Sequence, residues 1–243
     1  MSERTDATTS LDEDAARAFL FAVMAVAFGY PSEENLMRLA SSAADLEQAL
    51  RTLGLESPGS LPEVLEDAAA RHFDLQGLYN RLFVTGLAAP ISETAYELDK
   101  SARRAAELAD VQGFYRAFGL RIGAPVEPDH LVAELEFLSA LTQKSRYFAE
   151  RDEAAGFEVS AKAYRDFLED HLGRWYGIFC ERLEAATEDP FYRLFADLLR
   201  RLLDREITRL GLEPLRLSRY VSERPGPSSW CCGAGPGASA PSA

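Results

Sequence analysis

The sequence predicts an all-α fold, with one globular, helical-bundle-like domain over residues 11–218 and a disordered tail over 219–243. Apolar residues recur at intervals of three and four through most of the chain, which is the spacing of one helix face. No segment alternates apolar and polar residues as a strand does, and no unit repeats at a fixed period. The tail is rich in Gly, Pro, Ser and Ala, contains Cys231 and Cys232, and lacks a core-forming pattern.

In the first half of the chain, turn residues separate the predicted helices. The first helix opens at Asp12 or Asp14 and ends at Phe28, where Gly29-Tyr-Pro31-Ser forms a turn. Its apolar run is too short to span a bilayer, so we expect a buried core helix and no stable membrane insertion. The next helices are expected over 36–42, over 45–53 and, after a Gly/Pro/Ser-rich loop at 54–62, over 61–87.

In the second half, the same periodicity predicts four further helices, over 102–118, 128–151, 160–186 and 190–212. Gly119 is a natural left-handed C-cap for the first of them, and 121–126 is expected to be a linker. Asp189-Pro190 suits the start of the last helix, because the fixed φ of proline fits the first turn.

The segment Glu127-Pro128-Asp129-His130-Leu131 has the composition of a helix start. Pro128 is expected in the first turn, where its missing N–H costs nothing. Glu127 and Asp129 would place negative charge at the positive end of the helix dipole. Helix initiation alone is therefore a sufficient explanation of this segment, and it stays open beside any functional one.

The net charge of the chain limits the classes of partner that it can bind. A net charge of −13 over 243 residues, without a basic face, disfavours nucleic acid because phosphate backbones would be repelled. The same charge favours a cationic partner such as an arginine-bearing peptide, although acidic surfaces often serve solubility alone. The N-terminus lacks the positive region of a signal peptide, and three cysteines form no disulfide framework. We therefore expect a cytoplasmic protein.

Residues that could support catalysis are scattered. Cys180 is expected in the core, and His72, His130 and His171 lie in three separate segments. His130 and Glu134 are one helical turn apart, but two groups make an incomplete metal site. The sequence has no phosphate loop, Walker lysine or dinucleotide fingerprint. We predict that the protein is not an enzyme and uses no cofactor and no metal.

Several segments carry the likeness to a known family, and the most specific is Glu127-Pro-Asp-His-Leu131 with Glu134-Leu135. The others, which stand in the family's order, are Phe28-Gly-Tyr-Pro31, Leu78-Tyr-Asn-Arg-Leu-Phe83, Pro90-Ile-Ser-Glu93 with Tyr96, Phe114-Tyr-Arg-Ala-Phe-Gly-Leu120, Phe167-Leu-Glu-Asp-His-Leu172 with Trp175, and Asp189-Pro-Phe-Tyr192. Over residues 14–212 the chain resembles the TorD/DmsD/NarJ-type chaperones, specifically the TorD-like branch. It departs from the pattern at 90–93, where the second proline is missing.

The resemblance implies an all-helical chaperone with a groove that holds the twin-arginine signal peptide of a molybdoenzyme catalytic subunit. Holding this peptide until the bis-molybdopterin cofactor is inserted prevents premature export through the Tat pathway. A physical argument is compatible with this role. A signal peptide offers arginines beside an apolar stretch, so its binder needs carboxylates beside a hydrophobic groove. The family includes monomers and domain-swapped dimers, so a monomer or homodimer is expected.

Residue by residue, the resemblance assigns peptide recognition first to Asp129 and His130, with Pro128 fixing their backbone. Glu127 and Glu134 supply further carboxylates. His130 would tune binding if it gained a proton near neutral pH. An apolar wall is expected from four side chains, although core packing is the favoured explanation of the first three: Tyr79, Leu82, Phe83 and Tyr96.

Two alternatives stay open from the sequence. One is a nucleotide- or molybdenum-cofactor-binding accessory protein, with a weak site near Asp129 and His130. The missing phosphate loop argues against tight nucleotide binding. The other is a purely structural interaction or regulatory domain, which the sequence barely distinguishes from a chaperone.

Overall fold

The computed structural model describes residues 2–96, 100–123 and 126–217, and within these ranges the side chains of 12–96, 104–123 and 126–217. The described part is helical and contains no strand; its one isolated β-bridge joins Ser92 to His130. The all-α prediction is therefore confirmed. The predicted tail with Cys231 and Cys232 lies outside the described residues.

The α-helices follow one another through the chain with short connections. In order they are α1 (Ser2–Phe28), α2 (Glu33–Ser41), α3 (Ala43–Thr52), α4 (Leu61–Ala70), α5 (His72–Tyr79), α6 (Lys100–Ala117), α7 (Leu131–Ala149), α8 (Ala154–Phe167), α9 (Gly173–Ala186) and α10 (Pro190–Leu210). Two π-helical turns, Asn80–Val84 and Leu168–Leu172, and one 3-10 turn, Glu93–Tyr96, complete the set.

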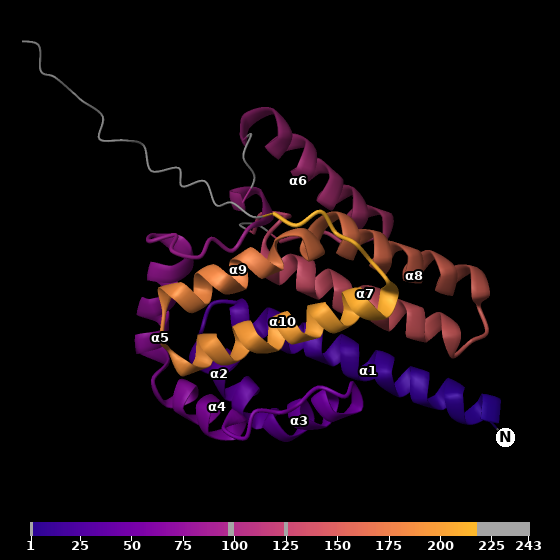
Figure 1. Cartoon of the computed structure of the whole chain (residues 1–243), viewed down its shortest axis with the longest axis horizontal. Helices are drawn as coiled ribbons and strands as arrows, with labels where there is room; N and C mark the ends of the chain where they lie inside the picture. The colour runs from indigo at the N-terminus through magenta and orange to yellow at the C-terminus, as the bar shows by residue number, and fades with distance from the viewer. Residues whose placement is uncertain (1, 97–99, 124–125, 218–243) are drawn as a thin grey trace, which may run out of the picture.

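Helix α1 runs through the middle of the molecule and packs along α7, which packs in turn against α8 (Figure 1). Its inner face is fully buried, with Leu20, Phe21, Met24 and Phe28 at 0% exposure. The prediction of a core helix is thus confirmed. None of the described helices is long and apolar enough to cross a membrane. Helix α6 lies at the top of Figure 1, on the opposite side from α3 and α4.

Helix α7 begins later than predicted. His130 is its N-cap and Leu131 its first residue, so Pro128 precedes the helix and does not sit in its first turn. The Asp129 side chain is likewise outside the first turn and is turned into the protein. The prediction of a helix from Pro128 is therefore wrong by one turn, because the segment 127–130 pairs with another part of the chain.

Two predicted helices contain breaks that the periodicity does not reveal. The helix predicted over 61–87 is divided into α4, α5 and a π turn. The helix predicted over 160–186 begins already at Ala154, and the π turn Leu168–Leu172 joins α8 to α9. Each π turn is followed by a glycine whose Cβ would lie about 2 Å from the carbonyl oxygen five residues earlier: Gly86 against Arg81, and Gly173 against Leu168.

A buried ion-pair network joins the first and last helices. Arg17 of α1 is 4% exposed, and its Nε lies 2.9 Å from Glu206 Oε2 of α10. Glu206 is 0% exposed and also accepts hydrogen bonds from the Tyr164 hydroxyl at 2.9 Å and from Arg209 Nη2 at 2.6 Å. Burial opposes ionisation of Glu206, but Arg209 and Arg17 hold the pKa of its carboxyl below the usual range. This network ties α1, α8 and α10 together.

Candidate functional site

The segments 90–96 and 127–131, far apart in the sequence, run side by side in the structure. The Glu93 N–H donates to the Asp129 carbonyl at 3.0 Å, and the Leu131 N–H donates to the Ile91 carbonyl at 2.9 Å. These bonds form the antiparallel bridge between Ser92 and His130. The pairing fixes the backbone immediately before α7, which positions every side chain of the predicted recognition segment.

Asp129 is buried and serves this pairing. It is 0% exposed, and its Oδ2 accepts hydrogen bonds from the Thr94 N–H at 3.0 Å and the Thr94 hydroxyl at 2.7 Å. Its Oδ1 has no hydrogen-bond partner among the described residues. Glu127, in contrast, is exposed, and Pro128 is half-buried. Of the two acidic residues around the proline, only Glu127 is therefore accessible to solvent.

His130 caps α7 with its ring. Its Nδ1 accepts a hydrogen bond from the Val132 N–H at 3.2 Å, which requires that this nitrogen carries no proton. Burial lowers the pKa of His130, and the nearby Asp129 carboxylate offsets only part of this effect. The imidazole is therefore held in the neutral form, whereas the sequence left room for a proton near neutral pH.

Glu134 lies fully buried one turn into α7. Its Oε2 accepts a hydrogen bond from the Trp175 indole N–H at 3.1 Å. Burial, together with the negative charges of Glu93 and Asp129, raises the pKa of Glu134 well above its ordinary value. The indole ring stacks on Tyr96, with centroids 5.7 Å apart, and the Tyr96 hydroxyl donates to the Pro90 carbonyl at 2.6 Å. Both Glu134 and Tyr96 are thus part of the interior.

A third buried acid, Glu93, contacts His171 and Arg174. Glu93 Oε2 lies 3.1 Å from His171 Nδ1, and Glu93 Oε1 accepts from Arg174 Nη1 at 3.2 Å. Burial raises the pKa of Glu93 although His171 and Arg174 oppose this. Burial opposes protonation of His171, but Glu93 and nearby acids raise its pKa overall. We refer to Glu93, Asp129, Glu134 and His171 as the buried polar cluster.

The sequence interpretation missed this cluster as a unit, although all three segments that build it were part of the family likeness. From the sequence, His171 is recognised only as one of three histidines in separate segments, whereas its side chain is 1% exposed in the structure. Glu93 is recognised only as the last residue of Pro90-Ile-Ser-Glu93. A usable signal was present, since charged side chains stand at positions where the surrounding periodicity requires burial. What the sequence does not reveal is that segments 90–96, 127–134 and 167–175 converge.

Tyr79, Leu82 and Phe83 lie in a different part of the core. Tyr79 packs edge-on against Tyr30 and Phe83, with centroid distances of 5.6 and 5.1 Å. Phe83 contacts Phe179, which packs against Trp175 beneath the buried polar cluster. All three predicted wall residues are at most 9% exposed. Phe83 connects this part of the core to the polar cluster through its contact with Phe179.

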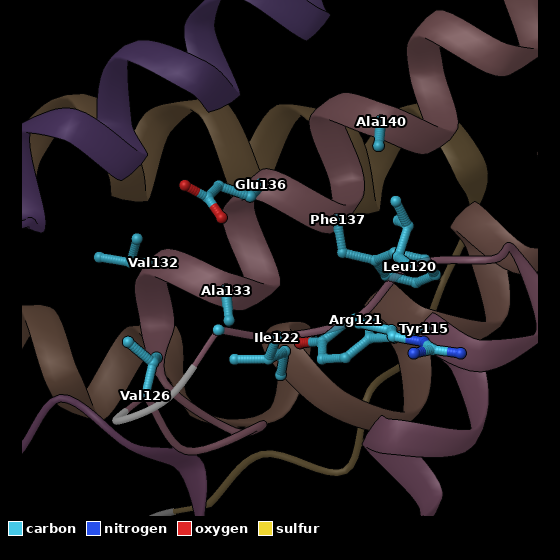
Figure 2. Close-up of a pocket in the computed structure, with 11 residues that line it drawn as sticks. Tyr115, Leu120, Arg121, Ile122, Val126, Val132, Ala133, Glu136, Phe137 and Ala140 are labelled. Carbon is cyan, nitrogen blue, oxygen red and sulfur yellow. The ribbon is translucent and has the colours of Figure 1, made fainter.

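An open pocket of about 260 Å³ lies beside the start of α7 (Figure 2). It is mainly apolar, and its wall is formed by α6, the segment 120–126 and the first turns of α7: Tyr115, Leu120, Ile122, Val126, Val132 and Phe137. The Tyr115 hydroxyl donates to the Pro128 carbonyl at 2.8 Å, which joins the pocket wall to the recognition segment. The charged side chains at its edge are Arg121 and Glu136.

A second, larger pocket of about 670 Å³ continues along α7 toward α1. It shares Glu136 and Ala140 with the first pocket, and Tyr147 and Phe148 line it farther along α7. Glu136 thus stands where the two pockets meet, and partial burial raises the pKa of its carboxyl. We refer to both pockets together as the α7 groove. An extended or helical peptide with an apolar face fits such a groove.

Known proteins with similar sequences are assembly factors. Residues 59–181, which include all nine predicted recognition residues and His171, match the model of the nitrate reductase delta subunit family. The chain is 28% identical over 213 residues to the perchlorate reductase assembly chaperone protein of Dechloromonas aromatica (strain RCB), covering 84% of this chain and 93% of the relative.

Two further relatives have the same kind of description. The chain is 28% identical over 211 residues to the chlorate reductase assembly chaperone protein of Ideonella dechloratans, covering 85% and 95% of the two chains. It is 30% identical over 203 residues to the selenate reductase assembly chaperone protein of Thauera selenatis, covering 83% and 93%. These alignments span nearly the whole length of each relative.

Proposed function

Because this chain belongs to the TorD-like family of molybdoenzyme maturation chaperones, we propose that its client is the catalytic subunit of a molybdenum-containing oxidoreductase. In this proposal it binds the apo form of that subunit together with its twin-arginine signal peptide, in the cytoplasm and before cofactor insertion. Its role is that of a binding protein and not of a catalyst, in line with the descriptions of its relatives.

The α7 groove is the observation that supports peptide binding. Its apolar lining suits the apolar stretch of a signal peptide, and Glu136 stands between its two halves. Glu127 is exposed beside the recognition segment whose Pro128 carbonyl contacts the pocket wall. Two carboxylates next to an apolar groove are what an arginine pair followed by apolar residues requires.

The predicted recognition residues divide into two roles in this proposal. Glu127, Pro128 and His130 are within reach of a bound peptide, because each is at least partly accessible. Asp129 and Glu134 position the accessible residues without touching the peptide, because both are 0% exposed. Asp129 is bonded to Thr94 and Glu134 to Trp175. Tyr96, Tyr79, Leu82 and Phe83 support these residues as parts of the core.

Capture of the client tests the chaperone role. The tagged full-length chain, expressed in the cytoplasm of its own host, is expected to co-purify with one molybdoenzyme catalytic subunit. Deletion of that subunit's N-terminal signal segment should abolish capture if the signal peptide is the main contact. Capture that is unaffected by the deletion would leave the chaperone role intact and remove the peptide from the proposal.

Substitution in the groove tests the binding surface. Val126→Glu places a charge on the apolar wall, and we expect at least about tenfold weaker binding of a synthetic client signal peptide, measured by fluorescence anisotropy. Val159→Glu is the matched control, because Val159 is also exposed but lies on α8, outside the lining of both halves of the groove. Equal peptide affinity of the two variants would remove the α7 groove as the binding surface.

A further inference from the structure

A group of candidate metal ligands extends the buried polar cluster to Glu107 of α6 and has no part in the proposed peptide binding. One nitrogen of His171 and one oxygen each of Glu93 and Glu107 all lie within 4.8 Å of one another. They come from three elements, namely the π turn Leu168–Leu172, the 3-10 turn Glu93–Tyr96 and α6. Ligands drawn from separate elements are typical of sites in which an ion holds a fold together.

The orientation of His171 points to a missing ligand. The side chain is 1% exposed, and its Nε2 makes no hydrogen bond to any described residue, which is costly for a buried polar atom. The other ring nitrogen, Nδ1, lies 3.1 Å from Glu93 Oε2. A carboxylate at Nδ1 fixes the proton there and leaves the Nε2 lone pair for a metal ion, as metal-bound histidines usually require.

The charges around His171 favour a cation. Asp110 Oδ2 lies 3.4 Å from Nε2, and Glu107, three residues earlier on α6, has an oxygen within 4.8 Å of one His171 nitrogen. With Glu93 at Nδ1, three carboxylates surround the ring. Arg174 is the guanidinium that faces them, with Nη1 3.2 Å from Glu93 Oε1 and 3.6 Å from Glu107 Oε2. A divalent ion would neutralise the remaining negative charge.

We propose that His171 Nε2, Glu107 and Asp110 bind one divalent transition-metal ion, while Glu93 holds the proton on His171 Nδ1. An imidazole nitrogen combined with carboxylate oxygens suits Mn²⁺, Fe²⁺ or Zn²⁺ better than Ca²⁺ or Mg²⁺, which take oxygen ligands. The ion ties α6 to the π turn and, through the contact of Glu93 with His171, to the 3-10 turn. Since Tyr115 of α6 lines the α7 groove, metal binding also rigidifies one wall of that groove.

The test uses Mn²⁺ and the full-length chain. Mn²⁺ prefers oxygen and nitrogen ligands, which keeps the thiols of Cys231 and Cys232 out of the measurement. Titration followed by the electron paramagnetic resonance signal of free Mn²⁺ is expected to give one site per chain. Glu107→Gln, which removes one ligand without changing side-chain size, is expected to weaken binding at least about tenfold.

Glu169→Gln is the matched control, because Glu169 carries the same charge in the same π turn as His171 but is exposed. It should leave Mn²⁺ affinity within about twofold of the parent. Equal weakening by the two substitutions, or no saturable binding by the parent, overturns the proposal in favour of diffuse attraction by an acidic surface. Circular dichroism of each variant verifies that the helical fold is retained.

A second measurement locates the ion. With three histidines in the chain, substoichiometric Mn²⁺ should broaden the ring proton resonances of His171 first and spare those of His72 on α5. Broadening of all three histidines together, or of His72 first, would overturn the assignment even if one Mn²⁺ binds.

Discussion

Asp129 shows how a segment that we propose for peptide recognition can depend on a side chain that solvent does not reach. Its Oδ2 holds both the backbone and the hydroxyl of Thr94, and Thr94 follows Glu93, which pairs with the Asp129 backbone. A bound peptide would meet Glu127 and His130 first, because Asp129 is 0% exposed. We therefore expect Asp129 to act as a positioning residue that sets the approach of its two neighbours.

The lowered pKa of His130 predicts how the free energy of unfolding depends on pH. Its pKa is lowered in the fold, so between that value and the unfolded value of 6.5 the unfolded chain binds more protons. The stability that comes from neutral His130 is present above pH 6.5 and is lost as the pH falls through this window. His130→Asn keeps a good N-cap without a titratable group, so the free energy of unfolding of the parent should fall relative to the variant in that window.

Denaturant unfolding of both proteins across pH 5 to 8 measures this difference. At pH 8 the two should agree to within about 1 kcal/mol, since Asn is a favoured N-cap residue. A constant difference between parent and variant at every pH would contradict the proposed role of the neutral ring.

At the residue scale the sequence identified Asp129, His130 and Glu134 as a group, but it could not tell which of them face solvent. The helix-start pattern places Asp129 in a first turn, where its carboxylate would be exposed. The structure turns it inward because Thr94, 35 residues earlier, offers two donors. Such a pairing depends on the tertiary arrangement and leaves no periodic trace in the sequence.

The helices themselves were largely predictable, and two of the exceptions, the π turns, share one cause. The long periodic segments that became α1, α7 and α10 carry an apolar stripe, and α10 has the predicted Asp189 cap and Pro190 start. The two π turns were missed because a single wide turn does not interrupt the apolar pattern. The signal was the glycine that follows each of them, Gly86 and Gly173, inside or beside a helical run.

A substitution at Gly173 tests how tightly the second π turn is packed. A Cβ there would lie 2.1 Å from the Leu168 carbonyl oxygen, so Gly173→Ala must displace backbone in the turn that holds His171. We expect a loss of about 1–3 kcal/mol in the free energy of unfolding, the usual cost of overpacking. Thermal or denaturant unfolding of the variant measures this loss.

Gly113→Ala is the control for that substitution. Gly113 lies in α6 with open space around its Cβ position, so alanine should stabilise the protein by about 0.5–1 kcal/mol. If Gly173→Ala also stabilises, the close approach of the Leu168 carbonyl does not constrain the π turn.

For the molecule as a whole, the buried network around Glu206 connects the two ends of the described chain. Glu206→Gln leaves the buried Arg17 with only Glu13 and Asp14 of its own helix as counter-charges, and we expect a loss of about 3 kcal/mol in the free energy of unfolding. Glu188→Gln removes an ion pair to Arg193 in which Glu188 is 86% exposed, and it should cost less than about 1 kcal/mol. Similar losses in the two variants, measured by denaturant unfolding, would mean that burial adds nothing to this pair.

For the whole molecule, helical periodicity was sufficient to predict the all-α fold. The family likeness was sufficient to predict the chaperone class. The sequence predicted a groove but not the position of the α7 groove, whose lining comes largely from α7, from the segment 120–126 and from α1. The expected wall of Tyr79, Leu82 and Phe83 lies in the core instead. From the sequence alone, one cannot tell whether an apolar residue near a motif faces the core or an open groove.

The pairing of Arg17 with Glu206 has a consequence for the order in which the protein is made. Arg17 emerges from the ribosome early, whereas Glu206 is among the last residues of α10 to be synthesised. Until then, Arg17 has only Glu13 and Asp14 of its own helix as counter-charges. The buried network that ties α1 to α8 and α10 can therefore close only after most of α10 has been synthesised.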